Sequence, residues 1–300
     1  MNRTRLKAVL TIVGIFFSLA TFAAEYLTSK DIKALTATPA EYRLPYGKEA
    51  LQFGDLRLPK GKGPYPVVVV IHGGCWLSKF VGASITAPLA EKLTQKGYAT
   101  WNIDYRGVDT AGGGWPGTFQ DVGNAIDYLR KIAPKYHLDL KHVVIIGHSA
   151  GGHLALWAAA RHKLPSASVI NSKNSLRIRG VIDLGGPGSL QAFIPMEEEV
   201  CGDNQIFARL LGTNPEVIKK RLAQVSPDEL LPFGVKQILI TGDNDVAVPP
   251  QLGEDYVEMA RNKGDEATFI LVKNAGHFEV IAPDSMAWPL VEAAVHSLME

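Results

Sequence analysis

The chain has 300 residues, with 31 lysines and arginines against 30 aspartates and glutamates, and a formal net charge of +1. A charge balance this close to zero argues against nucleic acid or anionic membrane surfaces as partners. A hydrophobic share of 46% with 20% charged residues excludes disorder, and the length suits one domain with a sizeable core.

The first 24 residues have the three-part pattern of a secretory signal peptide. Basic residues come first, residues 9–19 are apolar, and small residues then offer a cleavage site. We expect export of residues 25–300 to the periplasm or out of the cell, without stable membrane insertion after cleavage. The alternative is an uncleaved anchor, because residues 8–24 are uncharged but marginal in length for a membrane span. Loss of Arg3, Arg5 and Lys7 would take the net charge from +1 to −2.

Strand and helix patterns alternate through the first half of the chain. They comprise an antiparallel hairpin or pair of strands over 42–58, a buried strand over 67–71, a helix over 87–95, a strand over 98–105 and a long amphipathic helix over 118–131. Thr118 is expected to cap that last helix, with Asp121 as its capping-box partner. The alternation indicates one α/β domain with a mostly parallel sheet and helices on both faces. Asp104-Tyr105-Arg106 at a strand end favours a structural ion pair.

Two glycines directly follow the buried strand, in the sequence His72-Gly73-Gly74-Cys75-Trp76. Without a Cβ, the main chain can approach a substrate carbonyl there and direct N–H groups at its oxygen. We predict that the amides of Gly74 and Cys75 bind this oxygen, with Gly73 as the alternative donor. His72 is expected to brace the loop, while Trp76 either faces the substrate or packs beneath it.

Gly147-His148-Ser149-Ala150-Gly151 joins the apolar run 143–146 to a helical stretch over 154–161. A strand that turns sharply into a helix through a serine exposes this serine in a strained conformation, and the flanking glycines let the turn close. The pattern predicts Ser149 as a nucleophile and the Ala150 amide as an oxyanion donor. The alternative is an ordinary glycine-rich turn. His148 and His153 are expected to pack or to hydrogen-bond locally.

An acid and a histidine follow two later strands. Asp243 and Asp245 come after the apolar run 237–240, and His277 follows a strand over 268–272. Groups placed there lie at the carboxyl edge of the sheet, where open α/β sheets carry their chemistry. Serine, acid and histidine in this order are the parts of a nucleophile, its base and the group that orients the base.

With these motifs, the chain resembles the α/β-hydrolase superfamily from about Leu51 onward. Residues 72–76 and 147–153 look like its esterase/lipase-like branch, which includes kynurenine formamidases and acetyl or feruloyl esterases. The resemblance implies an α/β-hydrolase fold and a Ser149–Asp245–His277 triad that needs no metal or organic cofactor. Asp245 fits the family pattern because two residues and then Val-Pro follow it, so Asp243 is expected to bind the turn backbone instead. Cys75 departs from the tyrosine or glycine common in relatives, which changes the lining of the acyl pocket.

Residues 185–232 interrupt the alternation with several prolines and short helical pieces over 207–211 and 216–223. An insertion here commonly forms a cap in the hydrolase fold, so we expect a small cap whose Glu197-Glu198-Glu199 is a solvated face. Gly185-Gly186-Pro187 either lines the pocket or is a plain turn. The resemblance implies that Cys75 and Cys201 both lie near the mouth of the site, either bridged in an oxidising compartment or as separate thiols. No cysteine–histidine spacing indicates a metal site.

The sequence therefore predicts a serine hydrolase that cleaves a small carboxylic ester through an acyl-enzyme. One alternative is an amide hydrolase, either an arylformamidase or a small peptidase. Export argues against the formamidase, because its substrate is a cytoplasmic metabolite. A second alternative is a non-catalytic binding protein on a hydrolase fold, which the complete set of catalytic residue types disfavours. The oligomeric state is not predicted.

Overall fold

The computed structural model describes residues 26–300, so the predicted signal peptide lies outside the described residues. Within residues 26–300, no helix has the length and apolar character needed to cross a membrane. The strands are β1 (Tyr42–Pro45), β2 (Phe53–Arg57), β3 (Tyr65–Ile71), β4 (Ala99–Ile103), β5 (Leu138–His148), β6 (Gly180–Leu184), β7 (Lys236–Gly242) and β8 (Ala267–Val272). The α-helices are α1 (Ser29–Ala34), α2 (Ala87–Gln95), α3 (Gly117–Asp127), α4 (Leu129–Tyr136), α5 (Ala150–Ala160), α6 (Leu190–Phe193), α7 (Glu197–Cys201), α8 (Ile206–Leu211), α9 (Pro215–Val225), α10 (Pro227–Leu230), α11 (Pro250–Asn262) and α12 (Trp288–Met299).

All eight strands form one sheet in the order β1-β2-β4-β3-β5-β6-β7-β8. β2 runs antiparallel to β1 and β4, whereas β4, β3, β5, β6, β7 and β8 pair in parallel. The β-branched run of β3 lies at the centre, with Ile71 opposite Ile103 on one side and Gly147 on the other. This topology confirms the predicted early hairpin and the mostly parallel sheet.

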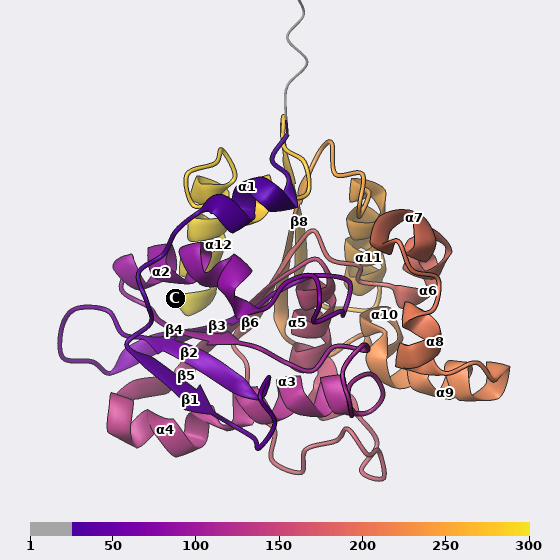
Figure 1. The fold of residues 1–300 in the computed structure, drawn as a ribbon, viewed down its shortest axis with the longest axis horizontal. Coiled ribbons are helices and arrows are strands. Elements are labelled where there is room, and N and C mark those ends of the chain that lie inside the picture. Colours follow the sequence, from indigo (N-terminus) through magenta and orange to yellow (C-terminus); the bar gives the residue numbers. More distant parts are fainter. Residues whose placement is uncertain (1–25) are drawn as a thin grey trace, which may run out of the picture.

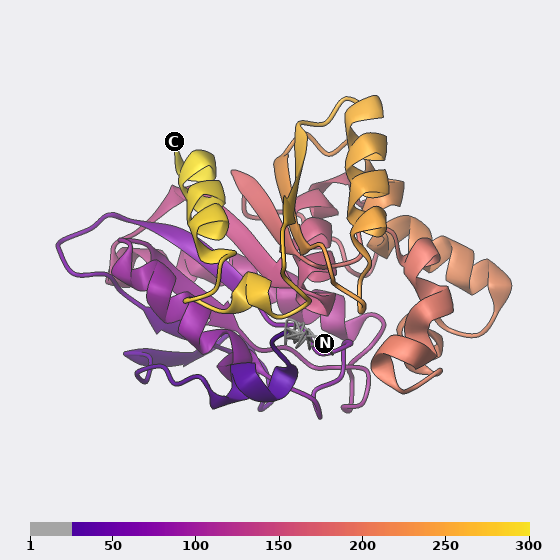
Figure 2. The same cartoon turned by 90° about the horizontal axis from the view of Figure 1, so that it is seen from above.

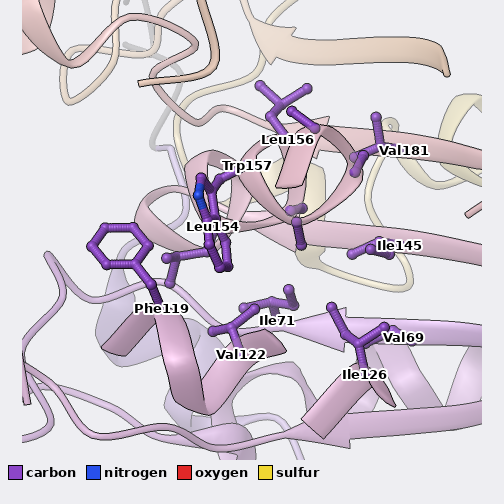
Figure 3. Packing of buried hydrophobic residues seen from close by; sticks show 14 of the residues in the cluster. Val69, Ile71, Phe119, Val122, Ile126, Ile145, Leu154, Leu156, Trp157 and Val181 are labelled. Carbon is purple, nitrogen blue, oxygen red and sulfur yellow. The ribbon is translucent and has the colours of Figure 1, made fainter. Parts of the chain in front are cut away.

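Helices cover both faces of the sheet (Figures 1 and 2). α2 and α12 pack on one face, and α3, α4, α5 and α11 pack on the other. Alternate residues of β3 serve the two layers, because successive side chains of a strand point to opposite faces. Val68 and Val70 join the α2 and α12 layer, whereas Val69 and Ile71 join the layer of α3 and α5. Figure 3 shows Ile71 beside Val122 and Val69 beside Ile126 in this second layer.

The helix predicted over 118–131 is wrong in its start and its length. α3 begins at Gly117 after Pro116, without a side-chain cap, and α4 starts separately at Leu129. The Thr118 hydroxyl donates instead to the Arg106 carbonyl, and Asp121 accepts two hydrogen bonds from the Arg106 guanidinium. Tertiary contacts therefore occupy both groups that a capping box would need. The Arg106–Asp121 pair also confirms the ion pair expected at the end of β4.

Residues 185–232, called the cap segment below, hold the short helices α6 to α10 at one side of the molecule (Figure 1). Within this segment, Glu198 and Glu199 are exposed as predicted. Glu197 is not, because its carboxylate is buried and accepts the main-chain N–H of Phe207 at the start of α8. This bond ties α7 to α8.

Candidate active site

Ser149 is the residue between β5 and α5, and its backbone has φ 55° and ψ −124°. Few non-glycine residues adopt a positive φ, and such positions concentrate at functional sites. A Cβ on Gly147 would collide with the Gly151 carbonyl, and a Cβ on Gly151 with the carbonyls of Ile71 and His72. The two glycines therefore let the strand turn into the helix through Ser149.

Asp245 and His277 meet at the carboxyl edge of the sheet. His277 Nδ1 lies 2.7 Å from Asp245 Oδ2, and the Asp245 side chain has no exposed surface. The other carboxylate oxygen accepts the main-chain N–H groups of Ala247 and Val248, at 2.9 and 2.8 Å. Because a carboxylate accepts, Nδ1 is the donor, which leaves Nε2 of the neutral ring as a base.

Asp243 occupies a different position from Asp245. Its carboxylate accepts the Asn244 amide at 2.6 Å and the main-chain N–H of Ala275 at 3.3 Å, and Lys273 Nζ lies 3.7 Å away. These contacts stabilise the turn after β7, and the carboxylate that contacts the His277 ring is Asp245. The structure thus separates the two aspartates that the sequence placed two residues apart.

Gly185 makes room for the Asp245–His277 pair. Its φ is +62°, and a Cβ there would lie 3.0 Å from Asp245 Oδ2 and 3.5 Å from His277 Nδ1. Gly185-Gly186-Pro187 is thus a turn whose first glycine faces Asp245 and His277.

Ser149 and His277 both line one cavity of about 320 Å³. The volume is at the small end of the range for ligand pockets, about 300–1,000 Å³. Gly73, Gly74 and Cys75 line it as well, whereas Ala150 is buried and does not. Most of the remaining wall is apolar and comes from Phe80, Val81, Ile85, Val200, Ala247 and Phe278.

Four main-chain amides around Ser149 have no protein acceptor. Within residues 26–300, the N–H groups of Gly73, Gly74, Cys75 and Ala150 donate no hydrogen bond, so the alternative donor Gly73 stays open. Ala150 is also the first residue of α5, where an N–H has no partner within the helix. These amides are therefore available to an oxygen that carries negative charge.

The loop that carries Gly74 and Cys75 is held from several sides. His72 Nδ1 contacts the Gly73 carbonyl at 2.8 Å and Nε2 contacts Asp104 at 3.1 Å, as expected of a bracing residue. Trp76 is buried and packs beneath the loop, which decides between the two predicted roles. The structure joins Cys75 to Cys201 in a disulfide, so neither remains a separate thiol.

His148 and His153 are buried and packed, as predicted, but their hydrogen-bond partners are distant in the sequence rather than local. His148 Nε2 lies 2.9 Å from the main-chain carbonyl of His277. His153 Nδ1 accepts the Trp76 indole N–H at 3.2 Å, so its Nε2 donates to the Val225 carbonyl at 2.9 Å. Burial holds the pKa of His148 well below its ordinary value and lowers the pKa of His153 to about 4. Both rings are therefore neutral at neutral pH.

Sequence reasoning overlooked one buried acid beneath the site, Asp183 of β6. Its Oδ1 accepts the Gly186 N–H at 2.7 Å, and its Oδ2 has no partner among the described residues. Burial, with a smaller effect from Asp245, raises the pKa of Asp183 to about 8. An isolated acid inside an otherwise apolar strand was the only available signal. Residues 26–300 contain no group of three or more acidic, histidine or cysteine side chains that could hold a metal ion.

Comparison with known proteins identifies the family. The BD-FAE family model matches residues 55–259. The chain belongs to this family of α/β-hydrolase esterases.

Curated relatives are distant. A probable isoprenylcysteine alpha-carbonyl methylesterase of Oryza sativa is 24% identical over 80% of this chain and 58% of its own length. A kynurenine formamidase of Drosophila melanogaster is 23% identical over 72% of this chain and 67% of its own. The chain thus spans little more than half the length of the first of these relatives.

Solved structures share the fold. A truncated carbohydrate esterase from gut microbiota superimposes with a TM-score of 0.71 and 24% identity, over 87% of this chain and 99% of the other. This likeness confirms the α/β-hydrolase fold expected from the sequence.

Proposed function

We propose that this esterase-family protein is a serine hydrolase that cleaves small carboxylic esters through a Ser149–His277–Asp245 triad. The observation that carries the proposal is the 2.7 Å contact between His277 and the buried Asp245, in a cavity that Ser149 also lines. The contact fixes the tautomer that a base needs, and Ser149, in a strained turn, lines the same cavity as this base.

In the proposed reaction, His277 Nε2 takes the proton of Ser149 as Oγ attacks the ester carbonyl. Asp245 stabilises the resulting imidazolium, and the amides of Gly74, Cys75 and Ala150 hold the oxyanion. His277 then gives the proton to the leaving alcohol as the carbonyl–oxygen bond breaks. His277 then takes a proton from water as the water oxygen attacks the acyl carbonyl. The imidazolium returns this proton to Ser149 Oγ as the bond from Oγ to the acyl carbon breaks and the acid leaves.

The cavity favours a compact substrate. With about 320 Å³ and mostly apolar walls, it suits a short acyl group better than a long one. We further propose that the first 24 residues direct the protein to the periplasm or the outside, and that it needs no cofactor there.

The test is turnover of p-nitrophenyl acetate together with covalent labelling by a fluorophosphonate. The purified protein should hydrolyse the ester and take up one probe per chain, whereas Ser149→Ala should lose nearly all of both. Ser175→Ala, which removes a half-buried hydroxyl outside the cavity, is the control and should behave as wild type. Full activity of the Ser149→Ala protein would refute the proposal.

A panel of acetyl, butyryl and feruloyl esters, an arylformamide and a short peptide would then separate esterase from amide hydrolase. We expect the acetyl ester to give the highest kcat/KM of the panel. A higher kcat/KM on the arylformamide or the peptide would replace the esterase assignment. Absence of both labelling and turnover would favour a non-catalytic binding protein.

A further inference from the structure

The loop of the proposed oxyanion hole has an unusual backbone. Cys75 and Trp76 are consecutive non-glycine residues with φ of 54° and 55°. Such residues persist in the left-handed region only where the surrounding structure holds them. The contacts of these two side chains therefore hold the Gly74 and Cys75 amides in place together with the bracing contacts of His72.

The cap segment supplies most of those contacts. Cys75 is bonded to Cys201 at the end of α7, across 126 residues of sequence. The Trp76 ring packs edge-on against Phe193 and Phe207, with ring centroids 6.2 and 5.3 Å apart. His153, which accepts the Trp76 indole N–H, in turn donates to the cap-segment residue Val225.

The cap side of the disulfide is itself fixed. Cys201 is buried, and its helix α7 is tied to α8 by the bond from the Phe207 N–H to Glu197. Val200, the residue before Cys201, lines the cavity together with Cys75. The disulfide therefore joins a braced helix to a strained loop at the cavity wall.

We propose that the Cys75–Cys201 disulfide positions the oxyanion loop, so that hydrolysis depends on its oxidised state. The inference rests on the proposed function, because it concerns the amides assigned to the oxyanion. Reduction by a dithiol would transfer two electrons and two protons, giving two thiols and oxidising the dithiol to its own disulfide. Cys75 is half-buried and lines the cavity, whereas Cys201 is buried, so the cavity is the side from which a small dithiol would approach the bridge.

The expected effect falls on kcat. Removal of a single oxyanion donor lowers kcat about 100- to 1,000-fold in serine hydrolases, and a displaced donor should cost less. We therefore expect reduction to lower kcat at least about tenfold. KM should change by less than about threefold, since the apolar walls that bind the substrate stay in place.

The experiment compares the full chain before and after treatment with dithiothreitol, with thiols counted by a chromogenic reagent and folding followed by circular dichroism. The wild type should lose kcat as two thiols appear, keep its spectrum, and recover kcat on reoxidation. Cys201→Ser should have the lowered kcat from the start and should not respond to dithiothreitol. Cys201 is the residue to change because Cys75 itself carries a proposed donor.

The outcomes separate the two proposals. An active wild type that keeps its kcat after both thiols appear would refute the positioning role and leave the esterase intact. Reduction that unfolds the chain would also refute it, because the bridge would then be purely structural. A wild type that neither turns over esters nor reacts with a fluorophosphonate in its oxidised form would refute the proposed function itself.

Discussion

His148 Nε2 donates a hydrogen bond to the main-chain carbonyl of His277, over 2.9 Å and 129 residues of sequence. The two rings also lie close, with centroids 4.6 Å apart. His148 directly precedes Ser149, the proposed nucleophile. The residue whose ring holds the loop of His277, the proposed base, is therefore joined to Ser149 by a single peptide bond. Burial keeps the His148 ring neutral by lowering its pKa, so this contact persists across neutral pH.

We predict that His148→Leu lowers kcat about ten- to a hundredfold. The change leaves the His277 carbonyl without its donor, so the loop of the proposed base is held less rigidly. A ten- to hundredfold lower kcat corresponds to about 1.4 to 2.8 kcal/mol of lost transition-state stabilisation. His148→Gln is the matched variant, because its amide nitrogen can reach the same carbonyl and should restore most of kcat. Ester hydrolysis measured from pH 5 to 9 checks both. Equal losses in the two variants would mean that the hydrogen bond has no positioning role.

A second prediction compares the two neighbouring aspartates. Asp245→Asn should lower kcat by several orders of magnitude, because the amide cannot hold the His277 tautomer; a loss of about 10⁴ is known for the same change in a serine protease triad. Asp243→Asn should lower kcat less than about threefold, since the side-chain contacts of Asp243 among residues 26–300 are with its own turn and Lys273. Initial rates at saturating ester measure both. The reverse ranking would show that the acid has been misassigned.

Gly185 gives a third prediction. Gly185→Ala would place a methyl group 3.0 Å from Asp245 Oδ2 at a φ of +62°, so both kcat and stability should fall. Gly234→Ala is the control, because its φ of +67° imposes the same backbone strain while a Cβ there contacts nothing within 4 Å. The free energy of unfolding, measured by thermal denaturation, should be lower in both variants, by about 1 kcal/mol from the backbone strain alone. Only Gly185→Ala should lose activity, and equal activity in the two would exclude a steric effect on the acid.

Short sequence patterns predict much of the fold. The unbroken apolar run of β3 and the glycines around Ser149 follow from short stretches of chain, because burial on both faces and a closed turn each need particular residue types. The predicted N-terminal capping of α3 by Thr118 is wrong because the Thr118 hydroxyl binds Arg106 and Gly114 instead. These contacts depend on tertiary packing. Glu197 was misjudged for the same reason, since its acceptor role depends on α8 folding beside α7.

The features of the candidate site also fall into those that the sequence predicts and those that depend on tertiary contacts. The order of serine, acid and histidine is visible in the chain, whereas the partner of His148 and the pairing of Cys75 with Cys201 are contacts across 129 and 126 residues. The sequence does not determine which hydrogen-bond partner a histidine beside a nucleophile will have. It also does not determine how far apart two cysteines lie in the folded chain. Such contacts are set by how the loops fold over the sheet edge, which a single sequence does not encode in any short segment.

Asp183 gives the last prediction, on stability and pH. Its pKa is about 8 in the folded chain, against an ordinary value of 3.8, because its side chain is buried beneath the turn that carries Ser149. Between these two values the folded protein holds a proton that the unfolded chain has released. The contribution of the protonated Asp183 to the free energy of unfolding is therefore complete below about pH 4. It is lost as pH rises toward 8, and the free energy of unfolding falls by at most about 1.4 kcal/mol per pH unit.

Asp183→Asn replaces the acid by a neutral group of the same shape, so it should remove this slope. Urea unfolding at pH 5, 6, 7 and 8 should give a flatter pH dependence for Asp183→Asn than for wild type, with the largest gain in relative stability at pH 8. Asp284→Asn, which changes a carboxylate on the surface, should keep the wild-type slope. Parallel curves for wild type and Asp183→Asn would mean that Asp183 is ionised in the folded state. It would then place a second negative charge near Asp245, and the buried carboxylate would need a partner that the Gly186 amide alone does not supply.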